Sequence, residues 1–136
     1  MRHNADCIIL TKENKILLQQ RPVHWERAGG CLVTFGGKIE NNESDQQAIC
    51  REIKEELGAE IAPTELIKIG DFEDHFSDHT ELSHLYFWHD KTGKITGCYE
   101  GEAVYYDQIN AALNHPQIMS YLARALLQCK KMALLK

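Results

Sequence analysis

The sequence has few of the residues that mark disulfide-rich, metal-finger or fibrous proteins. It contains 3 prolines in 136 residues, and its 5 cysteines are far apart with no CxxC pair. Disulfide scaffolds and zinc modules depend on closely spaced cysteines, so we expect these thiols to be reduced and to act as small apolar side chains. The chain also lacks internal repeats and low-complexity tracts, which excludes solenoid and fibrous architectures.

A basic excess and a long apolar run are missing as well. The formal net charge is −5, whereas proteins that coat DNA or RNA need a positive face that displaces counterions. No stretch approaches the roughly 18 apolar residues of a membrane span, and the first residues lack the apolar region and cleavage site of a signal peptide. We therefore expect a cytoplasmic protein with no nucleic-acid or membrane partner. An anionic ligand would have to be held by local positive charge or by a metal.

The overall composition is that of an ordinary globular domain, with 43% hydrophobic and 26% charged residues. A chain of 136 residues buries about 70% of the surface that it exposes when unfolded, which is enough for one core. We expect a single domain over residues 1–136, as a monomer or a homodimer.

A capped helix is predicted over residues 45–57. Ser44 followed by Gln47 is a capping-box pattern, in which each side chain bonds to the backbone of the other residue. Apolar residues recur at positions 49, 53 and 57 and give one buried stripe, and Gly58 is the residue expected just after a helix end.

One edge of this helix is acidic. At about 100° per residue, Glu52 and Glu56 lie one turn apart beside the apolar stripe, and Glu55 lies further round on the exposed side. Arg51 can pair with Glu55 but cannot neutralise all these carboxylates, and clustered hard oxygen ligands are what Mg²⁺ or Mn²⁺ requires. The alternative interpretation is a solvated acidic face, because glutamate is a good helix former.

The stretch around this helix resembles the Nudix box. The pattern is a glycine, five residues, a glutamate, seven residues, Arg-Glu, an aliphatic residue, any residue, Glu-Glu, any residue and a glycine. Ala59 then stands where a larger aliphatic residue is usual. The matching residues are Gly37, Glu43, Arg51, Glu52, Ile53, Glu55, Glu56 and Gly58.

The remaining pattern predicts strands on both sides of this helix and helices at the end of the chain. Strands are expected over residues 7–11, 15–21, 31–35, 66–76, 82–89, 95–98 and 103–106. A short helix is expected over 109–113, followed by a longer one with Pro116 in its first turn. This order fits an α/β or α+β domain. The resemblance implies the Nudix-type α/β/α sandwich with a mixed central sheet.

The resemblance also implies a metal centre. In Nudix hydrolases, carboxylates of the box bind Mg²⁺ or Mn²⁺, which assigns ligation here to Glu52, Glu55 and Glu56. A backbone carbonyl of Gly37, or of Gly36, would be a further ligand. The cations would neutralise phosphate charge and lower the pKa of the attacking water.

Family members differ in their general base, so this role stays open. Arg51 is expected to orient the acids and Glu43 to support them. Glu52 is the first candidate base, and Glu100 and Glu102 are alternative bases or extra ligands. A solvated turn is the competing interpretation of the last two.

Three residues are candidates for binding the substrate. Lys38 follows the glycine pair and Arg21 ends a predicted strand, and both resemble phosphate-facing positions of MutT-type enzymes. Asn114 precedes the last helix, where such enzymes read the base with an asparagine.

The resemblance favours a nucleoside triphosphate, ordinary or oxidised, cleaved to the monophosphate and pyrophosphate. Dinucleoside polyphosphates and nucleotide sugars are alternative substrates, although the proline, tyrosine and SQPWPFPxS features typical of other Nudix groups are missing. A non-catalytic nucleotide-sensing domain is the rival class, but such domains usually lose box glutamates. Four histidines at positions 75, 79, 84 and 89 fit no metal-binding spacing and are expected at a pocket rim or on the surface.

Overall fold

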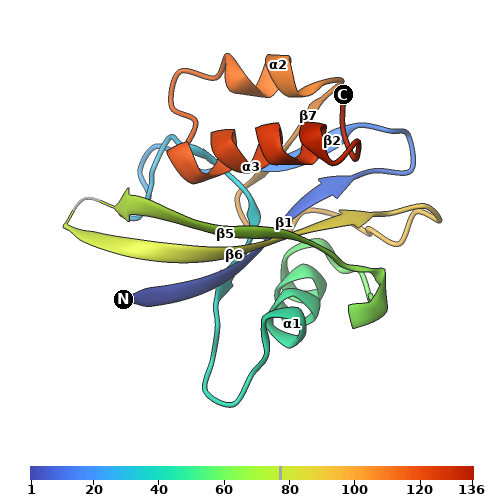
Figure 1. Ribbon diagram of the computed structural model, residues 1–136, viewed down its shortest axis with the longest axis horizontal. Helices are drawn as coiled ribbons and strands as arrows, with labels where there is room; N and C mark the ends of the chain where they lie inside the picture. The colour runs from blue at the N-terminus through green and yellow to red at the C-terminus, as the bar shows by residue number, and fades with distance from the viewer. Residues whose placement is uncertain (77) are drawn as a thin grey trace.

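A seven-stranded mixed sheet forms the centre of the protein (Figure 1). The computed structural model describes residues 1–76 and 78–136. The strand order is β3-β2-β1-β6-β5; β4 pairs with β1 and β7 with β2, and the β1–β6 pair is parallel. The strands are β1 (Arg2–Leu10), β2 (Ile16–Gln20), β3 (Leu32–Val33), β4 (Phe35–Lys38), β5 (Ile67–Phe76), β6 (His79–His89) and β7 (Glu102–Tyr106).

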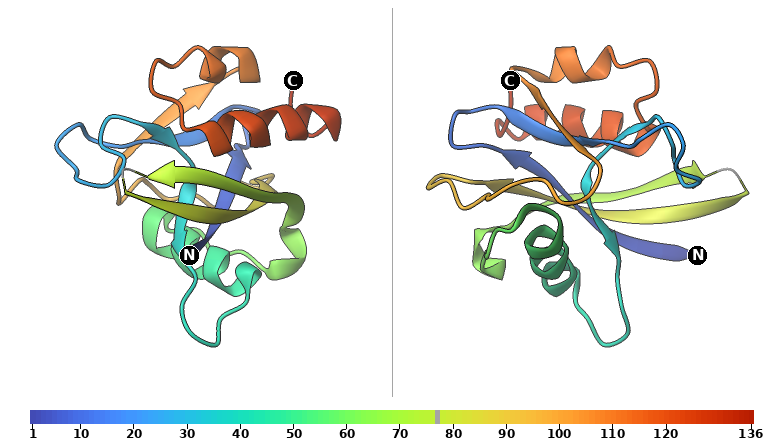
Figure 2. Two further views of the ribbon diagram at one scale, coloured as in Figure 1. Left: turned by 60° about the vertical axis from the view of Figure 1, so that its left-hand side comes forward. Right: turned by 180° about the vertical axis from the view of Figure 1, so that it is seen from behind.

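Helices cover both faces of the sheet. Figure 2 shows α1 (Asp45–Leu57) on one face and α2 (Ile109–Leu113) and α3 (Ser120–Lys131) on the other; a 3₁₀ turn, η1 (Pro63–Glu65), precedes β5. The predicted sandwich with a mixed sheet is therefore confirmed. None of the described helices is long and apolar enough to cross a membrane, and the five cysteines are free thiols.

Strand β1 separates two hydrophobic cores. Ala5, Cys7 and Ile9 pack with the apolar stripe of α1, whereas Ile8 belongs to the core beneath α3. This alternation follows from the two-residue period of a strand. The polar side chains of Asn4 and Asp6 therefore lie on the α3 side, where both are buried.

Helix α1 has the predicted caps. Gln47 N donates to Ser44 Oγ at 3.1 Å, and Ser44 N donates to Gln47 Oε1 at 2.8 Å. Gly58 ends the helix in the left-handed region at φ 68°, which glycine adopts without steric cost. Thr96 N donates to Leu57 O at 3.0 Å, so the segment before β7 is attached to this helix end.

Three sequence predictions about elements were wrong. The first strand begins at Arg2 and not at residue 7, because polar residues of its first half line a cleft instead of forming a loop. Residues 95–98 form no strand, since this segment bonds to the end of α1. The last helix begins at Ser120, beyond Pro116, because Ile118 forms a parallel bridge with Leu32 and keeps the chain extended.

Substitution of two glycines tests the end of α1. A Cβ atom on Gly58 would lie 1.9 Å from Thr96 Oγ1, whereas one on Gly93 would come no nearer than 3.3 Å to the flexible Lys12 side chain. Both glycines have positive φ, so we expect Gly93→Ala to cost about 1–2 kcal/mol. Gly58→Ala should cost about 1–3 kcal/mol more, through steric overlap. Urea unfolding measures both; equal losses would contradict the contact with Thr96.

Candidate active site

Three carboxylates meet where α1 passes the sheet. Glu52 and Glu56 come from α1 and Glu100 from the segment before β7, and one ligand oxygen of each lies within 4.8 Å of the others. Two hydrogen bonds hold the backbone around Glu100 in this place. Tyr99 N donates to Glu56 O at 2.7 Å, and the Gln19 side chain donates through Nε2 to Glu100 O at 3.0 Å. Among the described residues, this is the one group of three or more possible metal ligands.

The Glu56 carboxylate is buried between the helix and β4. Its exposed fraction is 2%, and its Oε1 accepts a hydrogen bond from Gly36 N at 2.9 Å. Burial raises the pKa of Glu56 to about 10, and the neighbouring Glu100 carboxylate adds to the rise. Without a cation, the Glu56 carboxyl group therefore keeps its proton at neutral pH.

Each glycine of the β4 pair leaves room for a close neighbour. A Cβ atom on Gly37 would lie 2.6 Å from Glu52 Oε1, and one on Gly36 would lie 2.3 Å from the carbonyl oxygen of Ala5. Gly36 also has φ 140°, a conformation that other residues rarely adopt. Glycine at position 37 thus lets Glu52 approach β4 this closely, and glycine at position 36 lets β4 lie close to β1.

Arg51 connects the acids to one another. Its Nε and Nη2 donate to the two carboxylate oxygens of Glu43 at 2.8 and 2.9 Å, and its Nη1 donates to Glu52 Oε1 at 2.7 Å. The guanidinium lowers the pKa of Glu43 to about 2. Nη2 also donates to the carbonyl oxygen of Lys38 at 3.1 Å. Arg51 thus holds Glu52 relative to the loop between β4 and α1.

Two predicted acids lie outside the group of three. The side chain of Glu55 is 60% exposed, and its carboxylate lies 3.7 Å from Arg51 Nη1. Glu102 is an exposed residue at the start of β7. Of the two alternatives in this segment, the structure brings Glu100 to Glu52 and Glu56 and not Glu102.

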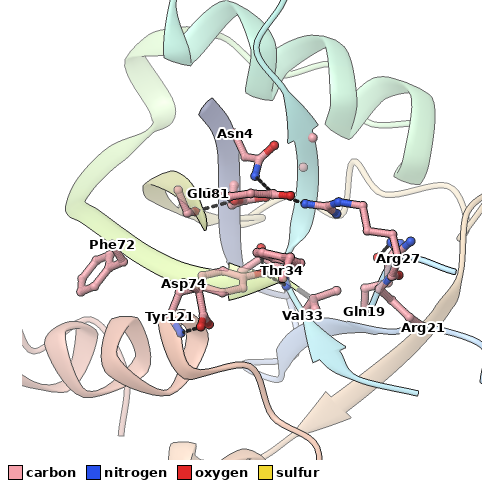
Figure 3. A pocket seen from close by; sticks show the side chains of 15 residues that line it. Asn4, Gln19, Arg21, Arg27, Val33, Thr34, Phe72, Asp74, Glu81 and Tyr121 are labelled. Atoms are coloured by element: carbon pink, nitrogen blue, oxygen red, sulfur yellow. Dashed lines mark hydrogen bonds and ion pairs between the residues drawn. The ribbon is translucent and has the colours of Figure 1, made fainter. Parts of the chain in front are cut away.

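A cleft extends from the glycine pair across the α3 side of the sheet (Figure 3). It encloses about 450 Å³, counting the solvent space at its mouth. Its wall is polar and charged, with aromatic rings from β5. The lining residues are Asn4, Asp6, Gln19, Arg21, Arg27, Val33, Thr34, Gly36, Gly37, Phe72, Asp74, Phe76, Glu81, Ser83 and Tyr121.

The predicted substrate-binding residues differ in their relation to this cleft. Arg21 lines it, with its guanidinium carbon 4.6 Å from the ring centroid of Trp25 and its Nε bonded to Arg27 O at 2.6 Å. Lys38 is the exposed last residue of β4, directly after Gly37, and does not line the cleft. Asn114 is an exposed residue at the end of α2 and does not line the cleft.

The histidines lie on two different faces. His79 Nε2 lies 2.5 Å from Glu81 Oε2, at the rim of the cleft. His84 is on the α1 side, 3.0 Å from a ring nitrogen of His3 and 2.8 Å from Asp71. In the part of the chain that the structure describes, no histidine belongs to a group of three metal ligands.

Sequence reasoning missed the polar floor of the cleft. Asn4, Asp6 and Glu81 are all less than 10% exposed, and burial raises the pKa of Asp6 to about 6. The available signal was the alternation of Asn4 and Asp6 with Ala5 and Cys7, which is typical of a strand with one polar face.

Comparison with known proteins decides the family. The NUDIX domain family matches residues 1–126. The chain belongs to the Nudix family. This Nudix chain is 36% identical over 115 residues to a CTP pyrophosphohydrolase of Escherichia coli, a match that covers 79% of this chain and 77% of the relative. It is 37% identical over 65 residues to an 8-oxo-dGTP diphosphatase of Proteus vulgaris, covering 48% of this chain and 57% of that protein.

Solved structures have the same Nudix fold. A MutT protein from Methanosarcina mazei superimposes with a TM-score of 0.81 at 16% identity, covering 97% of this chain and 94% of that chain. The E. coli ORF135 protein superimposes with a TM-score of 0.72 at 26% identity, covering 98% and 91%.

The raised pKa of Glu56 predicts how stability depends on pH. In metal-free buffer the folded Nudix domain keeps a proton on Glu56 that the unfolded chain releases above about pH 4.5, so this residue lowers stability as pH rises toward 10. Glu56→Gln removes the effect and keeps the acceptor for Gly36, so we expect a gain of about 3 kcal/mol at pH 7. Urea unfolding in EDTA at pH 5 and 8 measures it, with Glu60→Gln as an exposed control. Identical pH slopes in wild type and Glu56→Gln would contradict the assignment.

Proposed function

We propose that this Nudix hydrolase cleaves nucleoside triphosphates to the monophosphate and pyrophosphate. The observation that carries the proposal is the group of Glu52, Glu56 and Glu100 beside the Gly36–Gly37 pair, at one end of a cleft. The names of the two relatives, a CTP pyrophosphohydrolase and an 8-oxo-dGTP diphosphatase, support an ordinary or oxidised nucleoside triphosphate as the substrate.

Two features of the carboxylate group fit a divalent cation. Its donors are hard oxygen atoms, which Mg²⁺ and Mn²⁺ prefer, and burial raises the pKa of Glu56 to about 10, a cost of ionisation that a bound cation would offset. Glu52, Glu56 and Glu100 would hold it, with a carbonyl of Gly36 or Gly37. When bound, the cation neutralises phosphate charge and lowers the pKa of the attacking water.

Other residues of the box would position these groups. Arg51 keeps Glu52 in place through its bonds to Glu43, and Glu56 is anchored on Gly36 N. Glu55 stays a predicted ligand at the exposed edge. We propose Glu52 as the base that accepts the proton of the attacking water, with Glu100 as the alternative, because both lie at the mouth of the group.

Positive charge for the phosphates would come from Lys38, the residue after the glycine pair, and from Arg21, which lines the cleft with that pair. The cleft beyond Arg21, with Phe72 and Phe76, would then receive the base. Aromatic rings and hydrogen-bonding groups are what nucleobase recognition requires.

A substrate panel with a matched pair of variants tests the reaction. We expect Mg²⁺-dependent release of pyrophosphate from at least one nucleoside triphosphate. Glu56→Gln should lower kcat by about 10³-fold or more, because it removes a group that acts on the reacting centre. Glu60→Gln, whose exposed carboxylate pairs with Lys54 at 3.0 Å, should keep wild-type activity. Full activity of Glu56→Gln would refute the metal site; binding of a triphosphate without turnover by wild type would support the sensor class.

A second pair of variants distinguishes the role of Glu100, which precedes β7, from that of Glu102, the first residue of β7. Glu100→Gln should lower kcat by about 10²-fold or more, the usual effect of a lost acid–base or ligand group. Glu102→Gln should change kcat less than twofold, because its side chain is exposed and outside the group of three. The reverse ranking would show that this segment rearranges when the substrate binds.

A further inference from the structure

One buried amide connects the cleft with the carboxylate group. Gln19 lies on β2, is 2% exposed and lines the cleft beside Arg21 (Figure 3). Its Nε2 donates to the backbone oxygen of Glu100 at 3.0 Å, and its Oε1 accepts from Arg21 Nη1 at 3.4 Å. This side chain therefore contacts both a residue of the cleft wall and the segment that carries Glu100.

The two partners fix which way the amide of Gln19 points. A guanidinium only donates hydrogen bonds and a backbone carbonyl only accepts them, so Oε1 faces Arg21 and Nε2 faces Glu100. A flipped amide would place donor against donor and acceptor against acceptor. Arg21 is itself held, by the backbone oxygen of Arg27 and by the ring of Trp25. The donor that reaches Glu100 is therefore fixed in its direction.

The segment that carries Glu100 depends on single contacts of this kind. Residues 90–101 form neither a helix nor a strand, so no repeating hydrogen-bond ladder sets the position of Glu100. Gly101, the next residue, has φ 69°, and a Cβ atom there would lie 2.8 Å from Gln19 Cγ. The backbone at this turn is thus packed directly on the Gln19 side chain. Glu52 and Glu56, in contrast, are placed by helix α1 itself.

We infer that Gln19 is a positioning residue that holds Glu100 in the geometry needed to bind the cation, through the hydrogen bond to its backbone oxygen. This inference rests on the proposed function, and it adds a residue outside the Nudix box on which the carboxylate group depends. Replacing residues that orient metal ligands through hydrogen bonds typically lowers metal affinity or activity by about 10–100-fold.

Gln19→Met is the direct test, because methionine is similar in size but cannot donate to Glu100. We expect the variant to bind Mn²⁺ about tenfold more weakly than wild type, measured by titration calorimetry on the nucleotide-free protein. With a triphosphate substrate, kcat should fall by about tenfold while KM changes little, because the change acts on the reacting centre. Gln20→Met is the matched control: this neighbouring glutamine bonds to Gly30 O and to His115, away from the carboxylate group, so Mn²⁺ affinity should stay within about twofold of wild type.

A double-mutant cycle distinguishes positioning from a general loss of packing. If Gln19 acts through Glu100, then Gln19→Met should weaken Mn²⁺ binding by less than about twofold in a protein that already carries Glu100→Gln. Gln19→Asn, whose amide is one methylene shorter, should give the same pattern and carries the test if Gln19→Met does not fold. Thermal unfolding identifies any variant that has lost the fold.

Two outcomes would refute the inference. One is wild-type Mn²⁺ affinity and kcat in the folded Gln19 variants, and the other is an equal loss of Mn²⁺ affinity with and without Glu100→Gln. The calorimetric measurement needs no turnover, so failure of the proposed function is visible separately. A wild type that cleaves no triphosphate but shows the expected Mn²⁺ cycle would refute the proposed reaction and keep the role of Gln19.

Discussion

The hydrogen bond from Gly36 N to the buried Glu56 carboxylate joins helix α1 to the sheet at the point where the chemistry is placed. A carboxylate with 2% exposure is costly to ionise, and its pKa of about 10 measures that cost. The arrangement persists because glycine at position 37 leaves room for Glu52, glycine at position 36 lets β4 lie close to β1, and the hydrophobic stripe of α1 fixes the helix on the sheet. The site thus combines a well-packed scaffold with a carboxyl group that the protein alone keeps protonated at neutral pH.

Strand β1 explains why the carboxylate group and the cleft lie so close together. Its residues 4–7 pair with β4, which brings Asp6 opposite Gly36, while the same strand is parallel to β6 and brings polar residues of both strands to the α3 side. Side chains alternate along the strand, so one face packs against α1 and the other forms the floor of the cleft. The carboxylate group and the cleft therefore lie on opposite faces of one strand and meet at the glycine pair.

Much of the scaffold was readable from the sequence because its signals are local. The capping box at Ser44, the apolar period of α1 and the glycine at 58 each depend on neighbouring residues only, and the structure has them as predicted. Glu100 could be named as an alternative but not chosen over Glu102, since its place depends on long-range bonds, from Tyr99 N to Glu56 O and from the Gln19 side chain to Glu100 O. The Arg27–Glu81 pair joins residues 54 positions apart and left no pattern in the sequence. Polar residues at alternate positions of a strand were the signal that would have extended β1 to Arg2.

The central claim is that Glu52, Glu56 and Glu100 form one cation site on the glycine pair. The most direct measurement is the anomalous scattering of Mn²⁺ in crystals of the protein with a non-hydrolysable nucleoside triphosphate. The account predicts manganese density between α1 and the Gly36–Gly37 backbone, in contact with Glu52 and Glu56 and adjacent to Glu100. Manganese bound only by exposed acids away from this group, such as Glu60, at a concentration that supports full activity would contradict it.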